Sequence, residues 1–131
     1  MSPFVDSNVL LYLLSADAGK AGIAEVLLAG KVIVSVQVLN EFANVAHRKL
    51  GLAWPDVRAA LADVMRFADV RPLTVETHKL GIDVAERYRF SIYDALIVAA
   101  AIEAGCATLA SEDLQNGQRI DRRLSIMNPF A

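Results

Sequence analysis

Short apolar runs and helix-spaced apolar positions follow one another along this chain, and they predict alternating strands and helices. The runs predict strands at residues 4–6, 32–34, 70–75, 107–110 and 124–126. Helical spacing predicts helices at residues 9–14, 19–30, 36–50, 57–67, 77–88 and 94–104. Pro72 favours an edge or short position for its strand. This order predicts one α/β domain over residues 1–131, a three-layer α/β/α fold with a mostly parallel central sheet.

Eight apolar residues in a row, 95–102, follow Asp94. A helix that is apolar on every side is buried, so Asp94 opens a core helix. Ser91 precedes this acid by three residues and allows a second interpretation. In that interpretation Ser91 and Asp94 form an N-terminal capping box, and the carboxylate has only a local structural role.

The chain length of 131 residues suffices for one hydrophobic core. Apolar residues make up 55% of the chain, but no apolar run approaches the roughly 20 residues that cross a bilayer. The first residues lack a basic segment and Asp6 interrupts their apolar run, so we expect no signal peptide. Cys106 is the single cysteine, which is typical of a reducing compartment. We therefore expect a soluble, cytoplasmic protein without a membrane segment.

The net charge of −2 does not by itself indicate a nucleic-acid binder. One basic cluster, residues 47–49, closes a predicted helix, where the helix dipole favours cations. A second cluster consists of Arg119, Arg122 and Arg123, which follow the acidic turn at Asp113. These arginines either contact phosphates of a nucleic acid near that turn or keep the end of the chain solvated.

Four acids stand out from the others by their positions. They are Asp6, Glu41, Asp94 and Asp113. Asp6 and Asp113 follow predicted strands, and the carboxyl ends of parallel strands gather at one edge of a sheet. Glu41 falls within an apolar helix stripe, where a charge needs a partner, unless it lies at the edge of the stripe and reaches solvent.

Carboxylates crowded at one edge repel one another unless their pKa values shift or a cation binds. No cysteine pair and no histidine accompanies these four acids, which argues against a structural zinc site. Oxygen ligands alone suit Mg²⁺ or Mn²⁺. Ser111 could hold a water or phosphate there, or could cap the turn that follows its strand. Such a cluster is typical of enzymes that hydrolyse phosphodiesters with metal-activated water.

Residues 4–12, 38–42, 93–101 and 109–117 resemble the successive motifs of PIN-domain ribonucleases. Residues 124–130 are similar to the tail of VapC-type toxins of bacterial toxin–antitoxin pairs. The resemblance covers essentially the whole chain, and its specificity lies in four acids that occur in the right order at the right intervals.

This resemblance implies a PIN-like fold in which Asp6, Glu41, Asp94 and Asp113 are the catalytic residues and bind Mg²⁺, or Mn²⁺ in its place. It implies that Ser111 supports the metal site and that Asn8 holds the loop of the first acid. It further implies an endoribonuclease toxin that cuts tRNA or another structured RNA, is neutralised by an antitoxin and forms a homodimer. An apolar groove for the antitoxin is expected near the early helices, at Leu11, Leu14, Leu27 or Phe42.

Two other functions compete with the nuclease hypothesis. An inactive PIN-like binding module would retain the acids for folding or charge pairing, but intact acids at all four positions argue against it. A phosphoacceptor or phosphatase domain would use one aspartate as nucleophile. Such domains need a second acid beside or two residues after the first, where this chain has Ser7 and Asn8.

Overall fold

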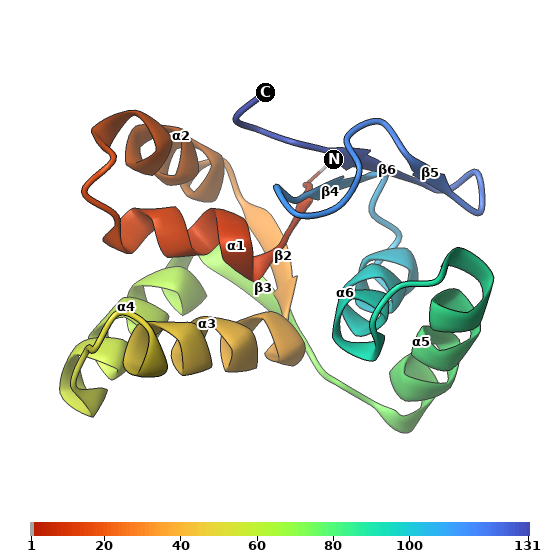
Figure 1. The fold of residues 1–131 in the computed structure, drawn as a ribbon, viewed down its shortest axis with the longest axis horizontal. Helices are drawn as coiled ribbons and strands as arrows, with labels where there is room; N and C mark the ends of the chain where they lie inside the picture. Colours follow the sequence, from red (N-terminus) through yellow and green to blue (C-terminus); the bar gives the residue numbers. More distant parts are fainter. Residues whose placement is uncertain (1) are drawn as a thin grey trace.

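The computed structural model describes residues 2–131, so Met1 of the predicted domain 1–131 lies outside the described residues. Six strands form one sheet in the order β3-β2-β1-β4-β6-β5 (Figure 1). The strands are β1 (Phe4–Val5), β2 (Val32–Ser35), β3 (Ala68–Arg71), β4 (Thr108–Ala110), β5 (Arg119–Ile120) and β6 (Leu124–Met127). Neighbouring strands are parallel except β5 and β6, which are antiparallel, so the predicted mostly parallel sheet is confirmed.

Helices cover both faces of this sheet. They are α1 (Ser7–Leu10), the 3-10 helix η1 (Leu11–Leu14), α2 (Ala18–Ala29), α3 (Val36–Arg48), α4 (Trp54–Phe67), α5 (Val75–Tyr88) and α6 (Ile92–Glu103). Figure 1 shows α5 and α6 together on one side of the central strands and α2, α3 and α4 on the other. This arrangement confirms the predicted three-layer α/β/α fold.

The strand predicted at residues 70–75 is wrong in its bounds, because β3 covers Ala68–Arg71 and ends before Pro72. Proline lacks the N–H that would continue the ladder, and β3 is the edge strand that Pro72 predicts. Strand β5 was not predicted, because two residues carry too little pattern. It pairs with β6, whose Leu124 and Ile126 are buried in the predicted alternation.

Several helices begin earlier than predicted, and local chemistry explains the early start of α4 and α5. Helix α4 starts at Trp54 because Pro55, which lacks an N–H donor, fits the first turn of a helix. Helical spacing in this segment predicts that Leu61, Val64 and Met65 face the core; Val64 is buried, but the prediction for Met65 is wrong, because Met65 is 48% exposed. Helix α5 starts at Val75 because Thr74 and Thr77 form a capping box.

Helix α6 is the centre of the core. Its residues 95–101 are all buried, as their apolar run predicts. Gly81 of α5 lies so close that an added Cβ would stand 2.8 Å from Leu96 Cδ2, so a glycine allows these helices to approach. Gly105 follows α6 with φ of +74°, the left-handed conformation expected after a helix end. None of the helices in residues 2–131 is long and apolar enough to cross a membrane.

Candidate functional site

Asp6 follows β1 directly and begins helix α1. Its N–H donates to the Ala110 carbonyl at 2.9 Å, so pairing with β4 continues to this residue. Its side chain is 3% exposed, and Oδ1 accepts a 2.7 Å hydrogen bond from the Ser7 N–H, which caps α1. A buried carboxylate thus lies at the carboxyl end of a parallel strand, where α/β sheets collect functional groups.

Two polar side chains tie Asp6 to the loop after β4. Ser111 is fully buried, and its Oγ donates a 2.9 Å hydrogen bond to Asp6 Oδ2. Asn8 Nδ2 lies 3.3 Å from Asp6 Oδ2 and 3.2 Å from Ser111 Oγ, while Asn8 Oδ1 accepts from the Glu112 N–H at 3.1 Å. Ser111 Oγ also accepts from the Leu114 N–H at 3.4 Å, so it both caps its turn and contacts Asp6.

Glu41 lies half-buried on α3, beside the apolar stripe of that helix. The buried stripe consists of Val38, Phe42 and Ala46. Gln37 Nε2 donates a 2.9 Å hydrogen bond to Glu41 Oε2, and Ser7 Oγ lies 3.2 Å from Oε1. Ser7 Oγ is also 3.4 Å from Asp6 Oδ1, so its single proton can be donated to either carboxylate. Glu41 is therefore at the edge of the stripe, but polar partners hold it toward Asp6.

Asp94 lies in the first turn of α6. Ser91 Oγ accepts a 3.2 Å hydrogen bond from the Asp94 N–H, so Ser91 caps this helix, but no hydrogen bond of the described residues returns from the Asp94 carboxylate to the Ser91 N–H, and the predicted capping box is only half formed. The Asp94 carboxylate is half-buried, and burial raises its pKa. The Ser91 hydroxyl opposes this rise in pKa, and the nearby carboxylate of Asp113, an exposed residue after β4, adds to it. The start of α6 therefore has Ser91 as its cap and Asp94 as an acid close enough to Asp113 to be affected by its charge.

The pKa of Asp6 depends on burial, on hydrogen bonds and on the neighbouring acids. Burial raises the pKa of Asp6 to about 7, and hydrogen bonds from Ser111 and the Ser7 N–H oppose this rise. The carboxylates of Glu41 and Asp94 raise the pKa of Asp6 further. Through Asp94 the effect reaches Asp113 as well, so charge repulsion links all four acids predicted from the sequence.

The charge of this acidic cluster has no protein counter-ion in the described chain. The four ion pairs in residues 2–131 use other acids: Asp69, Glu76, Glu112 and Asp121. Within the same residues, no group of three or more His, Cys, Asp and Glu side chains forms a ready metal cage. The donors nonetheless fit a hard divalent cation, because all are oxygens and none of the four ion pairs within residues 2–131 uses them.

A second polar cluster joins η1, α2 and the loop after β4 beside the acids. The Tyr12 hydroxyl donates a 2.6 Å hydrogen bond to Glu112 Oε1, and Lys20 Nζ donates to Glu112 Oε2 at 2.9 Å. Lys20 Nζ also lies 4.7 Å and 5.3 Å from the ring centroids of Tyr12 and Phe130, which meet edge to face. These contacts fasten the loop after β4 to α2 and to the end of the chain.

An apolar groove of about 440 Å³ adjoins both clusters. Its apolar lining comes from Leu11, Leu14, Val45 and Leu50, and its polar end from Asn8 and Glu112. The sequence-based candidates Leu11 and Leu14 therefore line it. Phe42, a further candidate, is 1% exposed and belongs to the core, and Leu27 is half-buried against that core.

The three arginines of the second basic cluster lie away from the acids. Strands β4 and β6 are parallel, and their carboxyl ends lie side by side at Ala110 and Met127. The turn before β6 holds Arg122 and Arg123, and Arg119 belongs to β5. The structure thus places these arginines toward the amino end of β6, opposite to the acids, although they follow Asp113 closely in sequence.

Two residues that contact the acids were not identified from the sequence as doing so: Ser7 and Gln37. Gln37 precedes Glu41 by four residues, the spacing at which side chains meet on a helix, so the sequence did contain that signal. The contact of Ser7 with Glu41 joins residues 34 positions apart, and nothing local indicates it.

The sequence model of the PIN domain family matches residues 4–121. No curated protein matches the chain as a relative.

Solved structures that share the fold include the following three. VapC20 of Mycobacterium tuberculosis, a sarcin-ricin loop cleaving toxin, is 24% identical with a TM-score of 0.71, over 86% of this chain and 90% of that one. A toxin–antitoxin complex from Klebsiella pneumoniae is 15% identical with a TM-score of 0.74, over 98% of each chain. VapBC2 from Rickettsia felis, bound to a DNA fragment from its promoter, is 17% identical with a TM-score of 0.69, over 98% of this chain and all of that one.

Proposed function

Because this chain belongs to the PIN domain family, we propose that it is a metal-dependent endoribonuclease of the VapC type, which hydrolyses phosphodiester bonds in tRNA or another structured RNA. The observation that carries the proposal is the buried Asp6 carboxylate, which shares the Ser7 hydroxyl with Glu41 and has no cationic partner within residues 2–131. A domain that needed these acids only for folding would pair them with cations. Here they face one another.

Asp6 and Asp94 are the proposed principal ligands of Mg²⁺ or Mn²⁺, with Glu41 and Asp113 as further ligands. A divalent cation, when bound there, supplies Lewis acidity and offsets charge on the phosphate oxygens. Asn8 and Ser111 keep the Asp6 carboxylate in one orientation through the hydrogen bonds at its Oδ2. Gln37 does the same for Glu41. The chain thereby holds its acids in position before substrate arrives.

The proposed reaction is hydrolysis by water at phosphorus. The bond between phosphorus and the 3′ oxygen breaks, which leaves a 5′-phosphate on one product and a 3′-hydroxyl on the other. Exposed Asp113 and half-buried Asp94 lie on the open side of the cluster, from which a phosphodiester can approach. Asp6 is the buried acid of the cluster.

We propose an antitoxin protein as the partner, with the apolar groove at Leu11, Leu14 and Leu50 as its docking surface. Similar structures include toxin–antitoxin complexes. The groove ends at Asn8 and Glu112, so a bound segment would reach the acids and block them. An amphipathic helix with apolar residues at i, i+3 and i+4 fits such a groove. We also propose that the chain forms a homodimer and acts in the cytoplasm. Sedimentation of the purified chain would test the proposed dimer.

The test is to express the chain and its Asp6→Asn variant in cells and to sequence the 5′ ends of the RNA. New 5′-phosphate ends at defined sites should occur with the native chain and be absent with the variant. Identical RNA ends from both proteins would contradict the nuclease and favour an inactive binding module.

A further inference from the structure

Four arginines line one groove of about 600 Å³ between the end of α5 and the β5–β6 hairpin. We call Arg87, Arg119, Arg122 and Arg123 the arginine patch. Leu80, Tyr88, Ile102 and Asp121 complete the lining. The groove lies outside the acidic cluster, and the proposed chemistry does not use it.

The positive charge of the arginine patch is largely unpaired. Asp121 is the one acid in the lining, and its Oδ1 accepts hydrogen bonds from Arg87 Nη1 at 2.6 Å and from the Tyr88 hydroxyl at 2.8 Å. Arg122 and Arg123 are exposed and form no ion pair within residues 2–131. A chain with a net charge of −2 therefore concentrates free cations at one hairpin.

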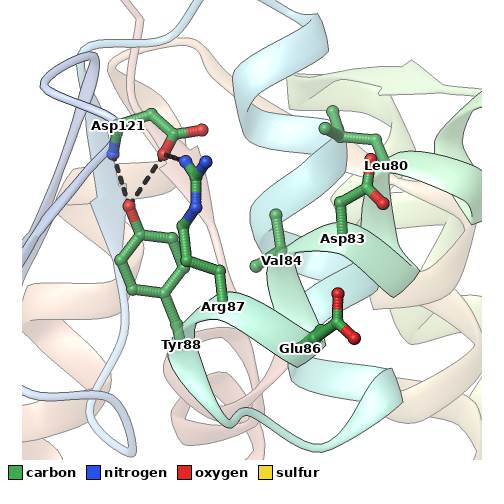
Figure 2. Close-up of a pocket in the computed structure, with 7 residues that line it drawn as sticks. All are labelled: Leu80, Asp83, Val84, Glu86, Arg87, Tyr88 and Asp121. Atoms are coloured by element: carbon green, nitrogen blue, oxygen red, sulfur yellow. Dashed lines mark hydrogen bonds and ion pairs between the residues drawn. The ribbon is translucent and has the colours of Figure 1, made fainter.

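The acids of α5 limit this cationic surface on one side. Asp83 and Glu86 belong to an adjoining pocket that also includes Arg87. Figure 2 shows them apart from Asp121, while Arg87 and Tyr88 reach across to it. An anion is therefore attracted along the hairpin rather than over the surface of α5.

The backbone of the hairpin is fixed in an unusual conformation. Asp121 and Arg122 have φ of +51° and +58°, and the Arg123 N–H donates to the Ile120 carbonyl at 3.0 Å, which closes a two-residue turn. The Tyr88 hydroxyl accepts a 2.9 Å hydrogen bond from the Asp121 N–H. The turn is therefore anchored to α5, and the guanidinium groups project from an ordered base that loses little backbone freedom on binding.

We infer that the arginine patch binds backbone phosphates of the RNA substrate at a distance from the cleaved bond. This inference rests on the proposed function. The patch lies toward the amino end of β6, whereas the acids lie at the carboxyl ends of β1 and β4. At about 3.3 Å per residue, the length of β6 alone separates the two by about 10 Å. A mono- or dinucleotide reaches only the acids, but a folded RNA reaches both, so the patch favours structured substrates.

Binding is tested in the Asp6→Asn background, where RNA stays intact. Fluorescence anisotropy with a labelled RNA stem-loop gives Kd as a function of salt concentration. Loss of two phosphate contacts in Arg122→Ala with Arg123→Ala should reduce the slope of log Kd against log salt by about 1.4–1.8. Arg122→Lys with Arg123→Lys keeps the charges and should keep most of the slope.

The matched control is Arg58→Ala with Arg66→Ala, which removes two exposed charges from α4. Its slope should stay that of the parent. Equal slopes for both alanine pairs would overturn the inference, because net charge alone would then explain binding. Tighter binding of duplex DNA than of the RNA stem-loop through the same arginines would overturn the assignment to RNA.

Cleavage assays separate this inference from the proposed function. In the active chain, the alanine pair at residues 122 and 123 should lower kcat/KM for the stem-loop several-fold and leave cleavage of a dinucleotide unchanged. Equal loss on both substrates would overturn the patch as a remote anchor. A native chain that cleaves neither substrate contradicts the nuclease, while anisotropy still decides whether the patch binds RNA.

Discussion

Ser111 Oγ donates a 2.9 Å hydrogen bond to Asp6 Oδ2, and this contact joins residues that are 105 positions apart in the chain. The hydrogen bond joins the loop after β1 to the loop after β4. It lowers the pKa of Asp6, whereas burial raises it.

Ser111→Ala should remove a charge-assisted hydrogen bond worth about 1.5–3 kcal/mol. The Asp6 pKa should then rise further, because the Ser111 hydrogen bond that lowers it would be missing while burial still raises it. Urea denaturation should show a lower free energy of unfolding, and in the presence of a chelator the pH-dependent loss of stability should extend to higher pH. Ser125→Ala, which removes a half-buried hydroxyl on β6, is the control. An unchanged pH dependence of stability would mean that Ser111 only caps its own turn.

Asp6 should make the metal-free protein less stable as the pH rises from about 4 to about 7. The native chain keeps the Asp6 proton up to a pKa of about 7, whereas the unfolded chain releases it near 3.8. The unfolded state then binds fewer protons, so the free energy of unfolding falls with pH, by on the order of 4 kcal/mol over the whole window.

Denaturation in the presence of a chelator, compared between the native chain and Asp6→Asn, isolates this contribution. The variant has no proton to lose and should gain stability relative to the native chain at pH 8 but not at pH 4. If the free energy of unfolding of the two proteins changed in parallel with pH, the folded state would not raise the pKa of Asp6.

Mg²⁺ or Mn²⁺ should stabilise the native chain at neutral pH. A ligand that binds only the folded state adds about 2.7 kcal/mol at one hundred times its Kd. The melting temperature should therefore rise with metal concentration, and Asp6→Asn or Asp94→Asn should reduce that rise. Glu76→Gln removes an exposed acid on α5 as the control. The same rise in all four proteins would indicate nonspecific salt effects instead of a bound metal.

Gly81→Ala should destabilise the fold by about 1–3 kcal/mol, because its new Cβ would overlap Leu96 Cδ2 between α5 and α6. Gly22→Ala on α2 is the matched substitution, since a Cβ there meets no atom within 4 Å. It should stabilise the chain by up to about 1 kcal/mol through helix propensity. Thermal melts of both variants measure the difference, and equal melting temperatures would contradict close contact of α5 with α6.

Much of the architecture could be predicted because its signals are local. The apolar run after Asp94 predicts a buried helix, and the acid after the run at residues 4–5 predicts a group at a strand end. Strand β5 was missed because two residues are too few to show an alternation of apolar and polar side chains. The bounds of β3 were missed because the apolar pattern continues past Pro72, where the hydrogen-bond ladder ends.

The position of the arginines could not be predicted from their neighbours in sequence. Arg119 follows Asp113 by only six residues, but the chain turns back along β5 and carries it away from the acids. Strand direction is set by pairing with β6, which is a tertiary property. Similarly, Gln37 lies within one helix turn of Glu41, but only the packed structure shows that this glutamate also meets Ser7.

The turn at Asp121 and Arg122 has a consequence for the evolution of this protein. Both residues adopt the left-handed backbone that glycine enters without penalty, so Arg122→Gly should slow thermal inactivation while it removes one cation from the hairpin tip. Heat resistance and affinity for a polyanion therefore favour different residues at position 122.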